Sequence, residues 1–439
     1  MKYSRRKFIQ STGIALSGIT LPGMAALPVV GKRLAPSDTL NVGLIGCRGM
    51  GAFDLKNHLK LDGVECAALC DVDSQVLADR TREIAELTGK TPANYADYRK
   101  LLEDKEIDIV IIGTPDHWHC LQMVDACDAG KDVYVEKPMA NSIAECKAMV
   151  DAVQKYNRIV QVGQQQRSGK HWKAVVDFVQ SGKLGKIRRV KVWANFNYGK
   201  GLEKAPDQNP PPELDWNMYL GPAPDQPFNP SRVHGGWRHQ WDFGGGLLSD
   251  WGVHLLDIVL WAMDVKGAPR SVSATGGIRV YPDRAIETPD TLDVVYDMGD
   301  FTLSWEHNGG IQREQYERIY GIAFVGEDGT LVVNRESWQI YPEVREGKYA
   351  MEALPRQQGQ NSYHAEHAAN FVNAVRNRTQ PACTVREGYA AAFIAHMGNI
   401  AWRTGSRLVW DETKQGFADN KPASQLIQPR YRKPWEMPG

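Results

Sequence analysis

The chain has 439 residues, and its 52 basic and 52 acidic side chains give a formal net charge of zero. At roughly 100–200 residues per domain this length predicts two or three domains, and the shares of 42% apolar and 24% charged residues exclude a disordered or fibrous chain. Because no basic excess is available to neutralise phosphates, we expect no nucleic-acid partner.

The N-terminal 36 residues have the features of a bacterial export signal. Arg5 and Arg6 precede an apolar pair, a weakly apolar stretch follows over 14–30, and small residues lie near position 25. This order is typical of a twin-arginine signal. We expect a signal and linker over 1–36 and a mature chain in the periplasm, or tethered at the membrane if the signal stays uncleaved. No other segment reaches the roughly 18 apolar residues of a membrane span, so no further membrane contact is expected.

The seven cysteines are an odd number, and no two form a CxxC pair. Because the twin-arginine route exports proteins that fold in a reducing cytoplasm, we expect buried free thiols rather than disulfides. Four histidines in the second half have spacings that match no compact metal site, and we predict no metal; they are His234, His239, His364 and His367.

A strand, a glycine turn and a helix begin at residue 40. The apolar run 40–45 precedes GCRGMG at 46–51 and a helical stretch to residue 61, and a second apolar run over 64–70 ends in Asp71. Such a glycine turn brings backbone N–H groups to a pyrophosphate. The acid after the next strand accepts ribose hydroxyls and disfavours a 2′-phosphate. We therefore expect NAD, with contacts from Gly46, Arg48, Gly49, Met50, Gly51 and Asp71. Arg48 stands at the usual second glycine, so Gly49 is expected to take that role.

Further strands are predicted over 107–113, 132–135 and 159–163, with a helix over 120–129. Polar residues follow each strand, and the carboxyl ends of parallel strands meet at the ligand-binding edge of such a sheet. We expect further cofactor contacts from Thr114, Pro115, His117, His119, Glu136, Lys137 and Gln165.

The second half is predicted to be mostly strand, over 187–197, 271–280, 291–297, 301–307 and 320–325. Tight turns at 298–300 and 327–330 indicate hairpins. Helical runs over 363–376 and 386–402 are expected to return toward the first domain. One face of such a sheet is left to be covered, so we expect a homo-oligomer, a dimer or tetramer.

The motifs in this order resemble the glucose–fructose oxidoreductase/inositol dehydrogenase (Gfo/Idh/MocA) family. The resemblance rests on GCRGMG, Asp71, TPDHWH at 114–119, EKP at 136–138 and GGGLLSDWGVHLLD at 244–257. It implies an α/β fold with an N-terminal Rossmann dinucleotide-binding domain over 38–166. A C-terminal α+β domain over 167–439, with a large open-faced, mainly antiparallel sheet, would follow, and the active site would lie between the two.

The implied chemistry moves a hydride between a sugar carbon and nicotinamide. His254 is expected to be the base, because imidazole titrates near working pH. Asp250, one helical turn earlier, is expected to orient it, and Lys137 to stabilise the developing alkoxide.

The substrate side is predicted from aromatic and polar residues that alternate over 193–243. Aromatic faces suit the C–H face of a pyranose, and the interspersed polar groups suit its hydroxyls. The proline-rich segment 206–230 is expected to be a long loop over the cleft, without regular elements. The expected substrate contacts are Arg167, Tyr198, Trp237, Arg238, His239, Trp241 and His254.

These observations predict an exported NAD-dependent oxidoreductase that acts on a hydroxyl of a sugar, glycoside or polyol, a glycoside 3-dehydrogenase being one form. Because a periplasm has no obvious pool to recharge free dinucleotide, we expect the cofactor to be loaded before export and to stay bound. One alternative is an NAD-dependent glycoside hydrolase, as in glycoside hydrolase family 109, whose usual tyrosine-containing motif is not evident at SDWGVH. Another is a non-catalytic sugar-binding protein.

Overall fold

The computed structural model describes residues 39–195, 197, 200–312, 315–359 and 362–439. The predicted export signal lies outside these residues. Within them, no helix combines the length and apolar character needed to cross a membrane.

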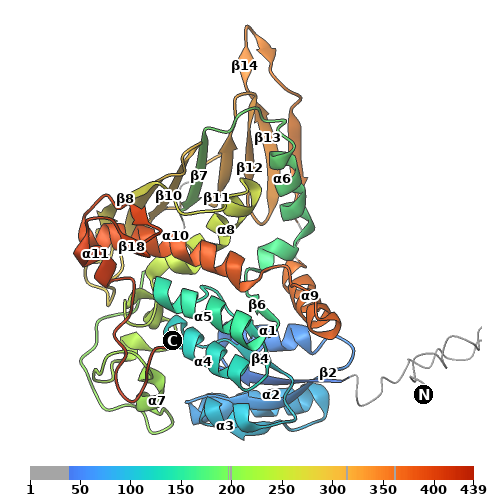
Figure 1. Ribbon diagram of the computed structural model, residues 1–439, viewed down its shortest axis with the longest axis vertical. Coiled ribbons are helices and arrows are strands. Elements are labelled where there is room, and N and C mark those ends of the chain that lie inside the picture. Colours follow the sequence, from blue (N-terminus) through green and yellow to red (C-terminus); the bar gives the residue numbers. More distant parts are fainter. Residues whose placement is uncertain (1–38, 196, 198–199, 313–314, 360–361) are drawn as a thin grey trace, which may run out of the picture. The chain divides into compact units, whose positions relative to one another are not determined.

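The N-terminal sheet has six strands in the order β3-β2-β1-β4-β5-β6, all paired in parallel (Figure 1). They are β1 (Leu40–Ile45), β2 (Val64–Cys70), β3 (Ala93–Tyr95), β4 (Ile109–Ile112), β5 (Asp132–Val135) and β6 (Val160–Val162). Five of these strands match predicted runs. The edge strand β3 escaped prediction because it is only three residues long and two of them are exposed.

Helices cover both faces of this sheet, and alternate strand residues therefore enter different cores. In β4, Val110 and Ile112 pack with α3, α4 and α5, whereas Ile109 and Ile111 pack with α1 and α9. The parallel sheet is thus buried on both sides, as its apolar strands require. The helices are α1 (Gly49–His58), α2 (Ser74–Thr88), α3 (Tyr98–Glu103), α4 (Asp116–Asp128), α5 (Ile143–Tyr156) and α9 (Tyr363–Asn377).

The C-terminal sheet has eight strands in the order β16-β13-β12-β11-β7-β10-β9-β8. All its pairs are antiparallel except β7 with β10, and the two predicted hairpins join β9 to β10 and β11 to β12. The fold class is as expected. The strands are β7 (Arg189–Ala194), β8 (Ser271–Gly277), β9 (Thr291–Asp297), β10 (Thr302–Asn308), β11 (Tyr320–Val325), β12 (Gly329–Val333), β13 (Ser337–Pro342) and β16 (Leu354–Gln358).

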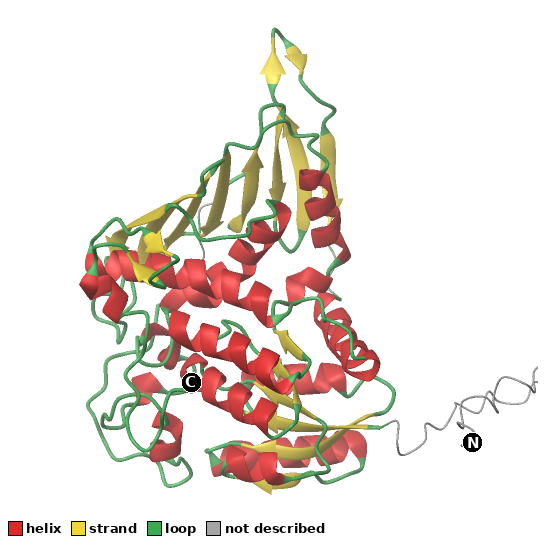
Figure 2. Ribbon diagram, viewed as in Figure 1, coloured by secondary structure: helices red, strands yellow, loops and turns green. Residues whose placement is uncertain are grey.

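Three helices, α6 (Lys170–Gln180), α8 (Val253–Ala262) and α10 (Val385–Thr404), cover one face of this sheet (Figure 2). β9 illustrates the reason, because Leu292, Val294 and Tyr296 are buried toward the helices while the residues between them face outward. The remaining short elements are β14 (Val344–Arg345), β15 (Lys348–Tyr349), β17 (Trp410–Asp411), β18 (Gly416–Phe417) and α11 (Lys421–Gln425).

The two sheets meet through elements that cross between them. α9 follows the second sheet in sequence but fills the core of the first, and α10 packs on α5 as well as on α8. The prediction that both helical runs return to the first domain is confirmed. All seven cysteines are free and six are buried, as expected.

Helix α4 begins earlier than the sequence indicated. We predicted a start at Cys120, but the helix begins at Asp116, directly after Pro115. The ring of a proline restrains its φ angle to a value near that of a helix, so a proline is well suited to the position where a helix begins. The polar residues that end β4 therefore lie on the first helical turn.

A buried ion pair fixes the junction between the sheets. Arg167 follows β6 and donates three hydrogen bonds of 2.8–2.9 Å to the carboxylate of Asp257 on α8. The side chains are 10% and 1% exposed. We predict that Arg167→Met lowers the free energy of unfolding by about 3–5 kcal/mol, because it leaves a buried carboxylate without its counterion. Urea unfolding checks this.

Two variants serve as controls for this measurement. Lys173→Met breaks the exposed Lys173–Asp177 pair and should change stability by less than about 1 kcal/mol. Adding Asp257→Asn to Arg167→Met should recover part of the loss. If Arg167→Met unfolds at the wild-type urea concentration, the pair does not hold this junction.

Candidate active site

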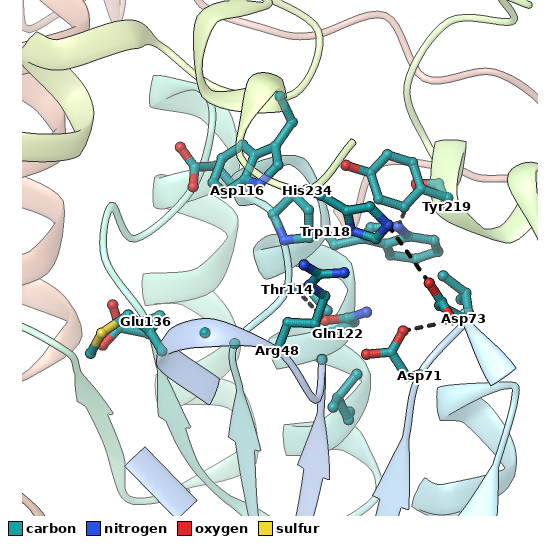
Figure 3. A pocket seen from close by; sticks show the side chains of 18 of the residues that line it. Arg48, Asp71, Asp73, Thr114, Asp116, Trp118, Gln122, Glu136, Tyr219 and His234 are labelled. Atoms are coloured by element: carbon teal, nitrogen blue, oxygen red, sulfur yellow. Dashed lines mark hydrogen bonds and ion pairs between the residues drawn. The ribbon is translucent and has the colours of Figure 1, made fainter. Parts of the chain in front are cut away.

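A deep pocket lies at the carboxyl edge of the parallel sheet, under a roof formed by residues 214–238 (Figure 3). Its floor comes from the turns after β1, β2, β4 and β5. Floor residues named by the sequence analysis are Gly46, Arg48, Gly49, Met50, Asp71, Thr114, Pro115, Glu136 and Lys137.

The glycine turn has the shape that a pyrophosphate needs. Gly49 has φ +41°, and a Cβ built on it would meet no atom within 4 Å, so its backbone is open toward ligand. A Cβ on Gly51 would lie 2.2 Å from the carbonyl oxygen of Gly46. Gly51 therefore lets helix and turn pack closely and does not itself line the pocket. Arg48 extends its side chain into the pocket (Figure 3). These features fit a dinucleotide. The open backbone is at Gly49, and position 48, the usual second glycine, carries an arginine side chain.

Asp71 is held at the pocket wall by two backbone donors. Its Oδ2 accepts from the N–H of Cys47 at 2.7 Å, and its Oδ1 accepts from the N–H of Asp73 at 3.0 Å. Each carboxylate oxygen can accept a second hydrogen bond, so the group is orientated and still able to bind the two ribose hydroxyls of an adenosine.

The roof comes from the aromatic-rich segment after β7. Backbone hydrogen bonds join it to the end of β2: Ser74 N–H donates to Glu213 at 2.9 Å, and Asp215 N–H donates to Val72 at 2.9 Å. His234 lies 3.7 Å from the carboxylate of Asp73. The segment covers the pocket as predicted, but it is not wholly irregular, because it contains the short helix α7 (Trp216–Leu220).

The inner end of the pocket brings together residues from both domains. Lys137, after β5, places its Nζ 2.7 Å from Oδ1 and 3.1 Å from the carbonyl oxygen of Asp250. Their side chains are 11% and 8% exposed. Arg238 from the roof lies 3.4 Å from Oδ2 of the same carboxylate. Asp250 is thus shared by the sheet edge and the roof.

A π-helical turn, Leu248–Gly252, positions Asp250 and runs directly into α8. Such turns insert an extra residue and are frequent at functional sites. His254 follows in the first turn of α8 and is 6% exposed. Its backbone carbonyl accepts from Nε2 of Gln166 at 3.0 Å. His254 does not line the covered pocket; it lies beyond Asp250, with its ring 6.0 Å from that of Trp251.

The charge state of His254 follows from its surroundings. Burial lowers the pKa of His254 well below 6.5, and the positive charges of Lys137 and Arg335 lower it further, while Asp250 opposes them. The imidazole is therefore neutral near pH 7, which is the state in which it can accept a proton.

Asp116 is a pocket residue that the sequence analysis missed. It lines the pocket and is only 3% exposed. Burial, followed by the neighbouring Asp250, raises the pKa of Asp116 well above its usual value, and this favours its protonated form. The sequence could have indicated this residue, because Asp116 directly follows Thr114-Pro115 at the end of β4. The prediction chose the two nearby histidines instead.

Those two histidines do not contact the pocket. Nε2 of His117 lies 3.0 Å from the carbonyl oxygen of Tyr219, and its ring packs on Phe243. His119 has one ring nitrogen 2.9 Å from the carbonyl oxygen of Thr114 and the other 2.8 Å from that of Pro138. Burial lowers their pKa values to about 3 and about 4, respectively. The expectation of cofactor contact is corrected, because both rings contact backbone carbonyls and neither lines the pocket.

Gln165 and Arg167 were predicted to contact ligand, and neither lines the pocket. Gln165 donates at 2.6 Å to Oε1 of Glu136 and touches the pocket only through that residue. Arg167 is occupied by Asp257 and does not line the pocket, so its predicted contact with substrate is corrected.

The predicted substrate residues are divided by the structure. Trp237 and Arg238 line the pocket, with the guanidinium 4.4 Å from the ring centre. His239 is buried outside it. Trp241 also lies outside it, stacked on Trp402, so neither residue lines the dinucleotide pocket, and their contact with substrate stays a prediction. Tyr198 lies outside the described residues. Among the described residues, no group of three or more His, Cys, Asp or Glu could hold a metal ion.

A parallel sheet with a glycine turn and an acidic residue at this pocket is the arrangement of a dinucleotide-binding domain. The family model for the oxidoreductase family with an NAD-binding Rossmann fold matches residues 40–164. The model for that family's C-terminal alpha/beta domain matches 168–310 and 322–437. The chain belongs to this family, Gfo/Idh/MocA.

Individual relatives are more distant. A glycosyl hydrolase family 109 protein of Shewanella pealeana is 31% identical over 204 residues, 43% of this chain and 45% of the relative. The chain thus matches less than half the length of such curated relatives. Among solved structures, levoglucosan dehydrogenase in complex with NADH and levoglucosan is 18% identical, with a TM-score of 0.64 over 84% of this chain and 99% of that one. Aldose-aldose oxidoreductase from Caulobacter crescentus, complexed with glycerol, is 18% identical, with a TM-score of 0.63 over the same shares.

We predict that His254 stays neutral between about pH 6 and 8, and that Lys137→Met raises its pKa by removing one of the charges that lower it. NMR titration of protein labelled on histidine, with the His254 signal assigned by substitution, measures both. Lys147→Met, on the exposed face of α5, should leave the titration unchanged. A His254 that is charged at pH 7 would contradict its assignment as a base.

Proposed function

We propose that this protein is an exported NAD-dependent oxidoreductase that acts on a hydroxyl of a sugar, glycoside or polyol. The observation that carries the proposal is the 2.7 Å contact between Lys137 and Asp250 at the inner end of the dinucleotide pocket, with the neutral His254 one helical turn further on. Export rests on the N-terminal sequence, with Arg5 and Arg6.

Each residue has a distinct role in this chemistry. Bound NAD supplies a group that accepts a hydride and, once reduced, can return it. Lys137 donates to the substrate oxygen and stabilises negative charge as it develops there. Asp250 holds the lysine in place, and His254 accepts the hydroxyl proton. Asp71 and the open backbone at Gly49 hold the adenosine and pyrophosphate.

The choice of a carbohydrate rests on the walls of the site and on related proteins. Trp237 lines the pocket beside Arg238, and an aromatic ring next to a charged group suits a sugar ring and its hydroxyls. The similar levoglucosan dehydrogenase and aldose-aldose oxidoreductase structures support this class.

The second candidate is a glycoside hydrolase that uses the same site. The 31% identity to a family 109 protein favours it. Transient oxidation at C3 acidifies the C2 proton, the aglycone is then eliminated, water adds, and the hydride returns to C3. The net reaction is hydrolysis, and it needs Lys137 and His254 just as the dehydrogenase does.

One product analysis separates the two. With aryl glycosides, a dehydrogenase forms 3-keto sugar with the aglycone retained, whereas the hydrolase releases the aglycone; mass spectrometry detects both. Lys137→Ala and His254→Ala should each lower turnover by about 10²–10⁴-fold and leave bound dinucleotide in place. Lys147→Ala is the matched surface control. Unchanged turnover in both site variants would overturn the assignment, and a protein that binds sugar without turnover would be a sugar-binding protein.

We also propose that the cofactor remains bound through export. The roof is fastened from a second side by the C-terminal segment. Arg432 N–H donates to the carbonyl of Pro222 at 3.0 Å, and its Nη2 donates to that of Asn217 at 2.6 Å. Trp435 packs edge-on against Trp118, with ring centres 4.9 Å apart. Figure 1 shows this segment beside α7. An exchanging dinucleotide would have to open these contacts.

Purified protein should therefore release close to one dinucleotide per chain on denaturation. Arg432→Ala and Trp435→Ala should speed exchange with added labelled NAD by about 5–30-fold, the effect of losing one or two hydrogen bonds or a packed ring. Lys433→Ala, an exposed neighbour, should not. Fully folded protein with an empty site, or exchange unaffected by both variants, would contradict a retained cofactor.

Self-association stays a prediction. The sheet face opposite α6, α8 and α10 includes Val295, which is 48% exposed on β9, and a dimer or tetramer would cover it.

A further inference from the structure

A guanidinium lies on the far side of His254 from the dinucleotide pocket. Arg335 is in the turn between β12 and β13 and is half-buried. Its Nε donates to Oε1 of Gln166 at 3.0 Å, and its guanidinium carbon lies 4.5 Å from the ring centre of Trp251 and 5.9 Å from that of Tyr363. Three uncharged side chains therefore fix its position.

Arg335 differs from the other guanidinium groups of this region in having no carboxylate. Arg167 is paired with Asp257, and Arg238 lies beside Asp250. Among the described residues, no acidic group pairs with Arg335, and its Nε alone donates to a protein acceptor. Its Nη atoms are not sealed from solvent. These donors face accessible space, and a partly desolvated cation without a counterion favours an anionic ligand.

The same contacts tie Arg335 to the reacting groups. Gln166, which accepts from Arg335, donates to the backbone carbonyl of His254 at 3.0 Å. The ring of Trp251 contacts both groups, with its centre 4.5 Å from the guanidinium carbon of Arg335 and 6.0 Å from the centre of the His254 ring. His364, on the same side, adds no positive charge at neutral pH, because burial and then Arg335 lower its pKa to about 4.

We infer that Arg335 binds the carboxylate of an acidic sugar whose reacting hydroxyl lies at Lys137 and His254. The carboxylate site stands on the geometry of Arg335, whereas the placement of the reacting hydroxyl rests on the proposed function. A guanidinium presents a planar pair of donors that matches the two oxygens of a carboxylate. With its Nε already occupied by Gln166, the Nη pair is the edge that remains for the ligand. The substrate class is therefore a uronic acid or its glycoside rather than a neutral sugar.

Calorimetric binding to the purified protein with its dinucleotide tests this without any need for turnover. Methyl β-D-glucuronide should bind about 10–100-fold more tightly than methyl β-D-glucoside, the range expected for one charged hydrogen-bonded contact. Arg335→Met, which keeps the length of the side chain, should remove that advantage and change glucoside binding by less than about threefold. Arg335→Lys should keep part of the preference for glucuronide, because lysine keeps the positive charge but lacks the planar pair of donors. Arg345→Met, at an exposed ion pair, is the control.

Several results would overturn the inference. Equal binding of glucuronide and glucoside by the wild type would do so, as would an equal loss of both in Arg335→Met, which would make the arginine a packing residue. Glucose 6-phosphate that binds as tightly as glucuronide, with the same dependence on Arg335, would replace the carboxylate by a phosphate. Thermal unfolding of each variant checks that it is folded. Glucuronide binding that depends on Arg335, in a protein that turns nothing over, would sink the proposed function and leave this inference standing.

Discussion

The contact between Lys137 and Asp250 is the constraint on which the site depends. The lysine belongs to the edge of the parallel sheet, and the aspartate to a helix that supports the antiparallel sheet. Neither domain alone contains a complete site. The buried pair of Arg167 and Asp257, on the same helix α8, keeps the two sheets in the relation that this contact requires. Stability and chemistry are therefore coupled through one helix.

Burial determines how charge is distributed around that lysine. The pKa values of Asp116, Glu136 and Asp54 are all raised, with burial as the largest cause. Asp54 and Glu136 are neighbours, and repulsion between two negative carboxylates makes ionisation of both unfavourable. The pair therefore tends to hold one proton between them. Asp250 is the carboxylate that contacts the ammonium directly. A site with many acids is thus kept from opposing the negative charge that develops on a substrate oxygen.

The first half was predictable from sequence because short-range patterns determine it. A buried parallel strand is a run of apolar residues, and the turn after it carries the ligand contacts, so Gly49, Asp71 and Lys137 could each be located in advance. The side on which a polar residue points was not predictable from the same pattern. His117 and His119 follow β4 almost as closely as Asp116 does, yet the first turn of α4, which begins at Asp116, directs the acid to the pocket and the histidines to backbone carbonyls.

Other residues were hidden by distance along the chain. Arg335 lies in a turn far from any motif, and only the folding of β12 and β13 into the second sheet brings it to Trp251 and, through Gln166, to His254. Arg167 was wrongly predicted to contact substrate. It lies close to the strand ends, but its guanidinium pairs with a buried carboxylate 90 residues away. Long-range contacts decided both cases, and no local pattern encodes them.

We propose that the two domains together form one site for hydride transfer at Lys137 and His254. The most direct measurement adds a glycoside or uronide to purified protein without external dinucleotide and follows the absorbance band of reduced nicotinamide. We expect a rise of up to one equivalent per chain in the wild type, and none in His254→Ala with the same dinucleotide content. A wild-type protein that holds its dinucleotide and binds the sugar, but never reduces the one with the other, would contradict it.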